Sequence, residues 1–546
     1  MVNINLHKFI KLVEVGIYIF RLFVLPLGLF KVNKEIPDLQ EPAGPSPSPS
    51  QITIDAEKIV SEIDPRIYGS FIEVLGKCIY QGIWDEGNEN VPLLDGLRQD
   101  VIEEVRSLKV SNIRFPGGCF ADTNSWKNGI GPREDRPVES NKQWKKYGPV
   151  MGPKHNNHFG TDEYLQFLKE VNSEAYISIN FGSGTPEEAA QWLEYTNGDQ
   201  STEYGALRAK NGHPEPYNVK IWGIGNETFG SWETGSRPAE EYAQDYLKFN
   251  KKMREIDSSI KFVAVGADFD YGNWSRTVLE VAGKEIDYLS LHVYIPERVS
   301  STLGNTKREF YNIIGGAFEV ERRIHWIDNV IAEVMGEKNK IPIALDEWGV
   351  IWNTRQHFEG YYTLREGLFA ASVFEILHRN SSIVKLANFA QLVNVVPMIV
   401  TSQTDIYHNP IYLAHQLFSN YAEQFMVDFQ VTTDYHLNPP YGNIRTEIEI
   451  PYLGCSVTVN KEKNRLVIIG INRHHAHNIN TTISVNNFDP KPAAKVYELN
   501  GPSHSAYNYF DKKNEVKIEQ KETTSASEFT YTFPAHSVTA LILEKK

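Results

Sequence analysis

The sequence predicts an α/β protein in which a (β/α)8 TIM barrel is followed by a C-terminal antiparallel β-sandwich domain. Eight strand-like segments alternate with helix-like segments over about 330 residues, which is the pattern of such a barrel. Several of these strands are near-continuous apolar runs, as expected of parallel strands that are covered on both faces. After about residue 405 the chain changes to short strands separated by Asn, Gly, Pro and Lys turns, which is typical of a sandwich.

Amphipathic segments separate the eight expected strands. The helix after the third strand has a clear start, because Thr185 is suited to cap it and Pro186 to begin its first turn. An open, doubly wound sheet is the alternative, but it should have a phosphate-binding GxGxxG loop after an early strand, and the sequence has none there. We expect the strands at residues 67–76, 111–118, 175–184, 219–227, 260–268, 286–294, 341–348 and 384–393.

Composition divides the chain into four parts. Residues 1–50 contain a hydrophobic segment and the Pro/Ser-rich linker EPAGPSPSPS, which should be extended and semi-rigid. Residues 51–66 have β character and are expected to add one or more strands to the sandwich. The catalytic barrel is expected over residues 67–404 and the sandwich over residues 405–546.

The apolar stretch at residues 9–30 leaves the location of the protein open. It contains Glu14, Arg21 and Pro26, which make it a poor membrane-spanning helix, and it lacks a clean small-x-small cleavage site. If the stretch acts as a signal or anchor, the protein is extracytoplasmic or tethered to a membrane.

The overall composition excludes several classes of protein. The 546 residues have a net charge of −14, and nucleic-acid binding requires a basic surface instead. Three cysteines are too few, and odd in number, for a disulfide framework. The sequence has no CxxC or HExxH motif, and we expect His474, His475 and His477 to lie in a solvated loop. No metal or other cofactor is therefore expected.

Two of the predicted strands end in a glutamate. Glu227 closes the apolar run VKIWGIGNE, and Glu347 closes IPIALDEW. A carboxylate costs several kcal/mol to bury unless it is paired, and α/β barrels keep their chemistry at the carboxyl ends of the strands. Two such glutamates are what glycoside hydrolysis requires. The alternatives are a helix-capping or ion-paired role for Glu227 and, for Glu347 with Asp346, an acidic pair on the surface.

Other polar residues occur near the ends of predicted strands. Arg114, in IRFPGG, can be buried only with a partner, for which a carboxylate such as Glu347 is suited; a structural ion pair elsewhere is the alternative. His292 and Tyr294 can bond to a carboxylate or a sugar hydroxyl, although a lone histidine is more often a satisfied core residue. Glu73 and Gln391 either bind a ligand or bond within the barrel.

With these residues in place, the chain resembles the α-L-arabinofuranosidases of glycoside hydrolase family 51, from about residue 51 to the C-terminus. The matching stretches are IYGSFIEVLG, RFPGGCFADTNSWKNGIGPREDRP, NNHFGTDEYLQFLKEV, WGIGNE, YLSLHVY and LDEWGV. The resemblance implies that Glu227 is the general acid/base and Glu347 the nucleophile, with Arg114 and His292 supporting them. It also implies an arabinose site formed by Glu73, Cys119, Asn226, Tyr294 and Gln391.

The same resemblance implies the reaction and the partners. The expected substrates are terminal α-L-arabinofuranosyl residues of arabinan, arabinoxylan or their oligosaccharides, cleaved with retention by carboxyl groups about 5 Å apart. Like-charge repulsion from Glu347 should raise the pKa of Glu227. Family habit suggests a homo-oligomer, a hexamer, in the cytoplasm. A β-xylosidase or endoglucanase on the same scaffold, or a carbohydrate-binding protein that has lost catalysis, remain alternatives.

Overall fold

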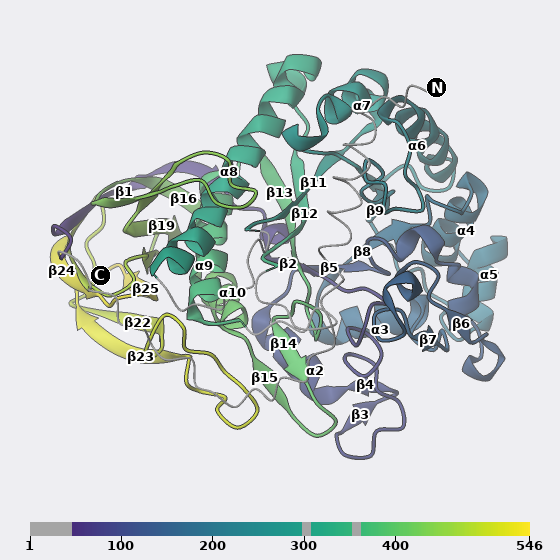
Figure 1. Cartoon of the computed structure of the whole chain (residues 1–546), viewed down its shortest axis with the longest axis horizontal. Helices are drawn as coiled ribbons and strands as arrows, with labels where there is room; N and C mark the ends of the chain where they lie inside the picture. Colours follow the sequence, from purple (N-terminus) through teal and green to yellow (C-terminus); the bar gives the residue numbers. More distant parts are fainter. Residues whose placement is uncertain (1–45, 297–306, 352–361) are drawn as a thin grey trace, which may run out of the picture.

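The computed structural model describes residues 46–296, 307–351 and 362–546, so the predicted hydrophobic segment, including residues 9–30, lies outside the described residues. Eight parallel strands close into a barrel, and they follow the predicted order along the chain (Figure 1). The predicted fold class is confirmed. The barrel strands are β2 (Gly69–Phe71), β5 (Asn112–Phe115), β8 (Glu174–Ile179), β9 (Ile221–Ile224), β10 (Lys261–Ala264), β11 (Tyr288–Tyr294), β12 (Ile343–Gly349) and β13 (Val384–Ala390).

A helix follows each barrel strand and covers the outside of the barrel (Figure 1). The eighth helix, α10, begins at Pro410 after Asn409, so the barrel continues beyond the boundary predicted at residue 404. The predicted boundary was too early because a hairpin of β14 (Ile399–Thr401) and β15 (Ile406–His408) precedes this helix. The covering helices are α2 (Gln99–Leu108), α3 (Thr161–Val171), α4 (Pro186–Asn197), α6 (Ala239–Arg254), α7 (Trp274–Ala282), α8 (Lys307–Met335), α9 (Leu364–Arg379) and α10 (Pro410–Tyr421); a shorter helix, α5 (Glu203–Lys210), follows α4.

The second domain is a nine-stranded sheet that begins with the most N-terminal strand of the described chain. β1 (Ser50–Glu62) lies between β16 (Phe425–Thr432), to which it is antiparallel, and β21 (Ile479–Asn486), to which it is parallel. Ile52 and Ile54 of β1 are fully buried in the core of this sheet. The other strands are β19 (Leu453–Val459), β20 (Arg465–Asn472), β22 (Ala493–Asn500), β23 (Lys517–Thr524), β24 (Glu528–Phe533) and β25 (Ser537–Glu544).

The sheet folds over on itself to enclose its own core. A Cβ atom at Gly470 of β20 would come within 2.3 Å of the ring of Phe533 of β24, although these strands are far apart in the hydrogen-bonded order. The two faces therefore pack closely, as in a sandwich, but within one continuous sheet. The parallel pair of β1 and β21 is a departure from the purely antiparallel arrangement that the sequence predicts.

The sheet domain packs against the barrel helices α8, α9 and α10 (Figure 1). Arg473, which is 1% exposed, donates to Glu375 and to the hydroxyl of Ser372, both on α9. His474 and His475 are buried beside this contact, so the prediction of a solvated loop for them is wrong. That prediction failed because the hydrophilic stretch is covered by another part of the chain.

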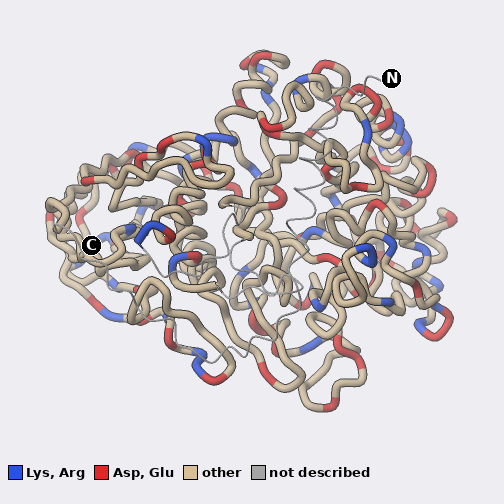
Figure 2. The backbone as a smooth tube through the Cα atoms, in the orientation of Figure 1, with Lys and Arg blue, Asp and Glu red and all other residues tan. Residues whose placement is uncertain are grey.

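Charged residues of both signs are interspersed over the two domains (Figure 2). Such mixing is typical of a well-solvated surface. None of the helices in the described parts of the chain combines the length with the apolar content that crossing a membrane requires.

Candidate active site

The two glutamates predicted from strand ends meet at the carboxyl end of the barrel. An oxygen of Glu227, an oxygen of Glu347 and a ring nitrogen of His292 all lie within 4.8 Å of one another. Glu227 comes three residues after the buried strand β9, and a turn with positive φ at Gly225 and at Glu227 itself directs the chain out of the barrel. Glu347 lies within β12 and is 6% exposed.

An irregularity in β12 brings two neighbouring acidic residues to the same side. The pairing of β11 with β12 runs from Ser290 opposite Ala344 to His292 opposite Glu347, so β12 has one extra residue at this point. Adjacent strand residues ordinarily face opposite sides, and a bulge of this kind redirects a side chain. As a result, Asp346 and Glu347 both contact residues of the barrel interior.

Glu347 is held by two donors. Nη1 of Arg114 lies 2.5 Å from its Oε1, and the hydroxyl of Tyr294 donates to its Oε2 at 2.7 Å. Arg114 is 1% exposed and also donates to Oδ1 of Asn226 at 2.8 Å and to the hydroxyl of Ser178 at 3.0 Å. A guanidinium with fixed partners orients the carboxylate.

Glu227 is bonded on both of its oxygens. Nδ1 of His292 lies 3.0 Å from Oε1, and the indole N–H of Trp232 donates to Oε2 at 2.7 Å. Burial alone would raise the pKa of Glu227, but the bonds and charge of His292, and then the bond from Trp232, hold it below its ordinary value. The prediction of a raised pKa is therefore wrong for the free enzyme, because a cation offsets the charge of Glu347.

His292 is that cation. Burial opposes its protonation, but Glu347, Asp346 and Glu227 outweigh burial and raise the pKa of His292 to about 10. Nε2 of His292 lies 3.4 Å from Oδ1 of Asp346, and its Nδ1 faces Glu227. The imidazolium of His292 thus contacts Asp346 through Nε2 and Glu227 through Nδ1.

Asp346 supports the site from within the barrel, a role that the sequence analysis missed. It accepts hydrogen bonds from the hydroxyls of Tyr176, at 2.6 Å, and Ser290, at 2.5 Å. Burial would raise the pKa of Asp346, but His292 and Arg114 hold it at about 2. Its position next to Glu347 was visible in the sequence, but the bulge that turns it inward was not.

The other predicted residues lie around the two glutamates. Glu73 accepts from the backbone N–H of Phe120 at 2.8 Å and faces the amide of Gln391 at 3.5 Å. Burial, with the charge of Glu347, outweighs the bond from Phe120 and raises the pKa of Glu73 to about 7. Oε1 of Gln391 is buried and has no partner among the described residues, so it is available to a ligand.

Cys119 and Asn226 lie close to Glu227 and to each other. The thiol of Cys119 is within 4.8 Å of a Glu227 oxygen, and Nδ2 of Asn226 is 3.9 Å from that sulfur. A Cβ atom at Gly118 would come within 2.5 Å of Oε1 of Glu347, so glycine is needed where the backbone passes this close. The structure therefore brings all nine predicted site residues together at one end of the barrel.

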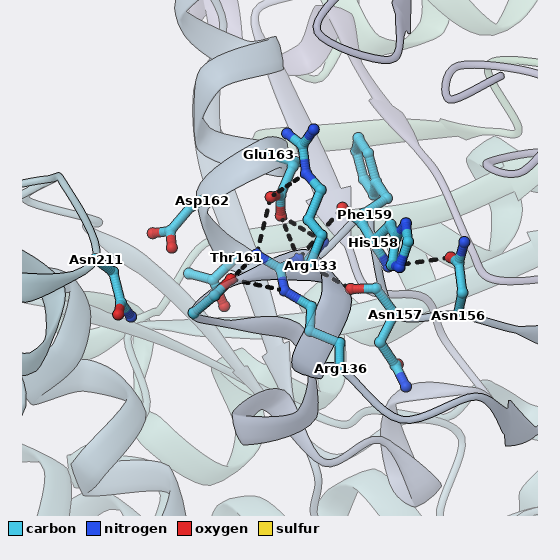
Figure 3. Close-up of polar contacts among 12 residues, drawn as sticks. Arg133, Arg136, Asn156, Asn157, His158, Phe159, Thr161, Asp162, Glu163 and Asn211 are labelled. Atoms are coloured by element: carbon cyan, nitrogen blue, oxygen red, sulfur yellow. Dashed lines mark hydrogen bonds and ion pairs between the residues drawn. The ribbon is translucent and has the colours of Figure 1, made fainter. Parts of the chain in front are cut away.

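The connection between β5 and α3, which contributes Gly118 and Cys119, is fixed by a buried ion pair (Figure 3). Arg136 makes two bonds to Glu163, at 2.9 and 3.0 Å, and Glu163 also accepts from Arg133 and from the N–H of Gly160. A small cavity beside this connection is lined mainly by aromatic side chains, together with His155 and two asparagines, and includes neither Glu227 nor Glu347. The network serves to shape the connection.

Two residues of the loop after β9 were not predicted. Trp232 bonds to Glu227, and Glu233 is 6% exposed and accepts from Nδ2 of Asn226 at 3.3 Å. The loop sequence GSWETG has no periodicity, so nothing in it indicated which side chains turn back toward the barrel.

A closed parallel barrel with adjacent glutamates at the ends of its fourth strand and within its seventh defines a (β/α)8-barrel glycoside hydrolase. Comparison with known protein families supports this class. Residues 104–309 match the family described as the α-L-arabinofuranosidase 1 domain, and residues 346–537 match the α-L-arabinofuranosidase C-terminal domain. The chain belongs to the α-L-arabinofuranosidases of glycoside hydrolase family 51, as the resemblance implied.

Individual relatives support the same family. An α-L-arabinofuranosidase C from Emericella nidulans is 32% identical over 90% of this chain and 96% of its own length. An intracellular exo-α-L-arabinofuranosidase from Bacteroides ovatus is also 32% identical, over 90% and 95%. A Thermotoga maritima α-L-arabinofuranosidase, solved as an arabinose complex, superposes with a TM-score of 0.84 at 35% identity over 91% of this chain and 100% of that one. The chain is therefore an α-L-arabinofuranosidase, and the alternative activities are not favoured.

Proposed function

We propose that this enzyme removes terminal, non-reducing α-L-arabinofuranosyl residues from arabinan, arabinoxylan or their oligosaccharides in two steps, with retention at the anomeric carbon. The observation that supports retention is the separation of the carboxylates, since an oxygen of Glu227 lies within 4.8 Å of one of Glu347. Retaining enzymes space these groups by about 5 Å, whereas inverting enzymes need more than about 6.5 Å to admit a water molecule.

In the first step Glu347 attacks the anomeric carbon while Glu227 protonates the departing glycosidic oxygen, so the C–O bond to the leaving group breaks and an arabinosyl ester forms. In the free enzyme the proton rests on His292, whose Nδ1 faces Glu227 at 3.0 Å, and it passes to Glu227 as the leaving oxygen gains charge. Arg114 and Tyr294 hold Glu347 in line for attack.

In the second step Glu227, now a carboxylate, takes a proton from water, and the resulting hydroxide displaces Glu347 from the sugar. The proton then passes from Glu227 back to Nδ1 of His292, which restores the free enzyme. The ester has no negative charge, so the repulsion between the two glutamates is relieved while it exists. Arabinose hydroxyls are bound by a ring of polar groups, namely Glu73, Cys119, Asn226, Tyr294 and Gln391.

Replacement of the nucleophile tests these roles. Glu347→Ala should abolish turnover of 4-nitrophenyl α-L-arabinofuranoside, and added azide should restore it and give the inverted arabinosyl azide. Full activity of this variant without azide contradicts the assignment. Product analysis on arabinan and on arabinoxylan oligosaccharides identifies the natural substrate.

Assembly and location complete the proposal. The family resemblance supports a homo-oligomer, a hexamer, which light scattering of the purified enzyme tests directly. The Bacteroides ovatus relative is named intracellular, which supports a cytoplasmic location. Cell fractionation tests it, because a signal or anchor function of residues 9–30 would place the enzyme in the membrane or outside the cell.

A further inference from the structure

Glu233 is a buried acid beside the catalytic pair to which the proposed mechanism gives no task. Its carboxyl group is within 4.8 Å of both the Cys119 thiol and a Glu227 oxygen. Oε1 accepts a hydrogen bond from Nδ2 of Asn226 at 3.3 Å. Oε2 is buried and has no hydrogen-bond partner at normal distance among the described residues, and within that part of the chain the carboxyl group otherwise contacts the weakly bonding thiol of Cys119. A buried carboxyl oxygen without a hydrogen bond costs free energy, so the presence of Glu233 at this position calls for an explanation.

A chain of hydrogen bonds connects Glu233 with the nucleophile. Asn226 gives its N–H to Glu233 and uses its carbonyl oxygen to accept from Arg114 at 2.8 Å, and Arg114 in turn donates to Glu347. A side-chain amide can turn over by 180°, and a fixed donor on one side with a fixed acceptor on the other prevents this. Asn226 is 1% exposed, so bulk water does not compete with these two bonds.

We propose that Glu233 is a positioning residue that acts through Asn226, holding its amide in the orientation that supports Arg114 and Glu347 and presents Asn226 to the sugar. The inference rests on the proposed roles of Glu227 and Glu347. It adds Glu233 as the residue that fixes the position of Asn226 relative to Glu347.

The surroundings of Glu233 favour its neutral form. The groups that face it are Glu227 at the end of β9, Asp122 and Cys119 in the connection after β5, and Glu73 after β2. Burial, followed by repulsion from Glu227 and Asp122, raises the pKa of Glu233 well above its ordinary value. One oxygen therefore accepts from Asn226 while the other carries the proton, an arrangement that a glutamine side chain reproduces.

Three variants test the proposal: Glu233→Gln, Glu233→Met, and Thr234→Val as a control in the same loop, where the hydroxyl of Thr234 donates to Gln143. Glu233→Gln keeps the acceptor and the neutral state, so kcat should stay within about threefold of the wild type and the basic limb of the pH profile should not move. Glu233→Met removes the acceptor, and kcat should fall about 30-fold with little change in KM. Thr234→Val should keep its activity.

A double-mutant cycle with Asn226→Ala separates positioning from general damage. If Glu233 acts through Asn226, Glu233→Met should cost little further activity in the Asn226→Ala background. Multiplicative losses overturn the proposal. So does a shift of the basic limb to lower pH in Glu233→Gln, because that shift means that an ionised Glu233 had been helping the site to retain the proton that His292 and Glu227 share.

Glu227→Ala and Glu347→Ala, measured in the same assay, keep the two proposals distinguishable. Full activity of these two variants overturns the catalytic assignment whatever Glu233 does. If both lose activity while the Glu233 and Asn226 effects are independent, only the positioning role of Glu233 fails.

Discussion

Replacing Arg114 with methionine removes the cation to which the proposed nucleophile is bonded while keeping an apolar stem of similar length. Three hydrogen bonds are lost, to Glu347, Asn226 and Ser178. Breaking a buried ion pair by removing one partner costs about 3 to 5 kcal/mol. If about half of 4 kcal/mol falls on the alignment of Glu347 for attack, kcat/KM should fall about 30-fold, since a tenfold change in rate corresponds to about 1.4 kcal/mol.

The assay is the measurement of kcat/KM on an aryl arabinofuranoside, combined with urea unfolding. Arg136→Met is the matched control, because Arg136 is also buried and makes two bonds to a carboxylate, that of Glu163, in the connection after β5. Both variants should lose several kcal/mol of unfolding free energy, but only Arg114→Met should lower kcat/KM about 30-fold. An unchanged kcat/KM in Arg114→Met, or an equal fall in both variants, refutes the reasoning.

Three further predictions follow from single contacts. Trp232→Phe removes the N–H that donates to Glu227 at 2.7 Å, so kcat on oligosaccharides should fall about 10-fold and kcat on activated aryl substrates much less; equal losses would contradict this. Gly118→Ala places a methyl group 2.5 Å from Oε1 of Glu347, so activity should fall about 100-fold with little change in Tm, and retained activity would show that the backbone can yield. Burial lowers the pKa of His474 to about 3, so below pH 6.5 the unfolded chain binds a proton that the native protein does not, and stability should fall by up to about 1.4 kcal/mol per pH unit between pH 6 and 4. His474→Asn should flatten that decline in urea titrations, and an unchanged slope would contradict the assignment.

The barrel could be predicted because each of its strands is a local signal. An apolar run that ends in a polar residue indicates both a buried strand and the position of its carboxyl end. This pattern identified Glu227 and Glu347 without any knowledge of their neighbours. The order of the strands followed from their alternation with helices. The parallel pairing of β1 with β21 could not be predicted, because it depends on residues far away in the chain.

The parts of the site that were missed depend on relations between elements. Asp346 turns inward because β12 gains one residue relative to β11, a property of the pair of strands and not of either sequence. Glu233 turns back toward Asn226 from a loop without periodicity. The predicted direction of the pKa shift of Glu227 was wrong because that shift is set by the protonated state of His292. This state depends on three carboxylates, two from β12 and one from the turn after β9.

The position of β1 has a consequence for the synthesis of the protein. Residues 50–62 leave the ribosome before the barrel, whereas β16 and β21, between which they insert, are translated after it. The apolar side of β1, with Ile52 and Ile54, therefore remains unpaired until β16 and β21 have been synthesised. A C-terminal fragment produced alone would lack the strand between β16 and β21. A separate peptide spanning residues 46–62 should bind there and complete the sheet.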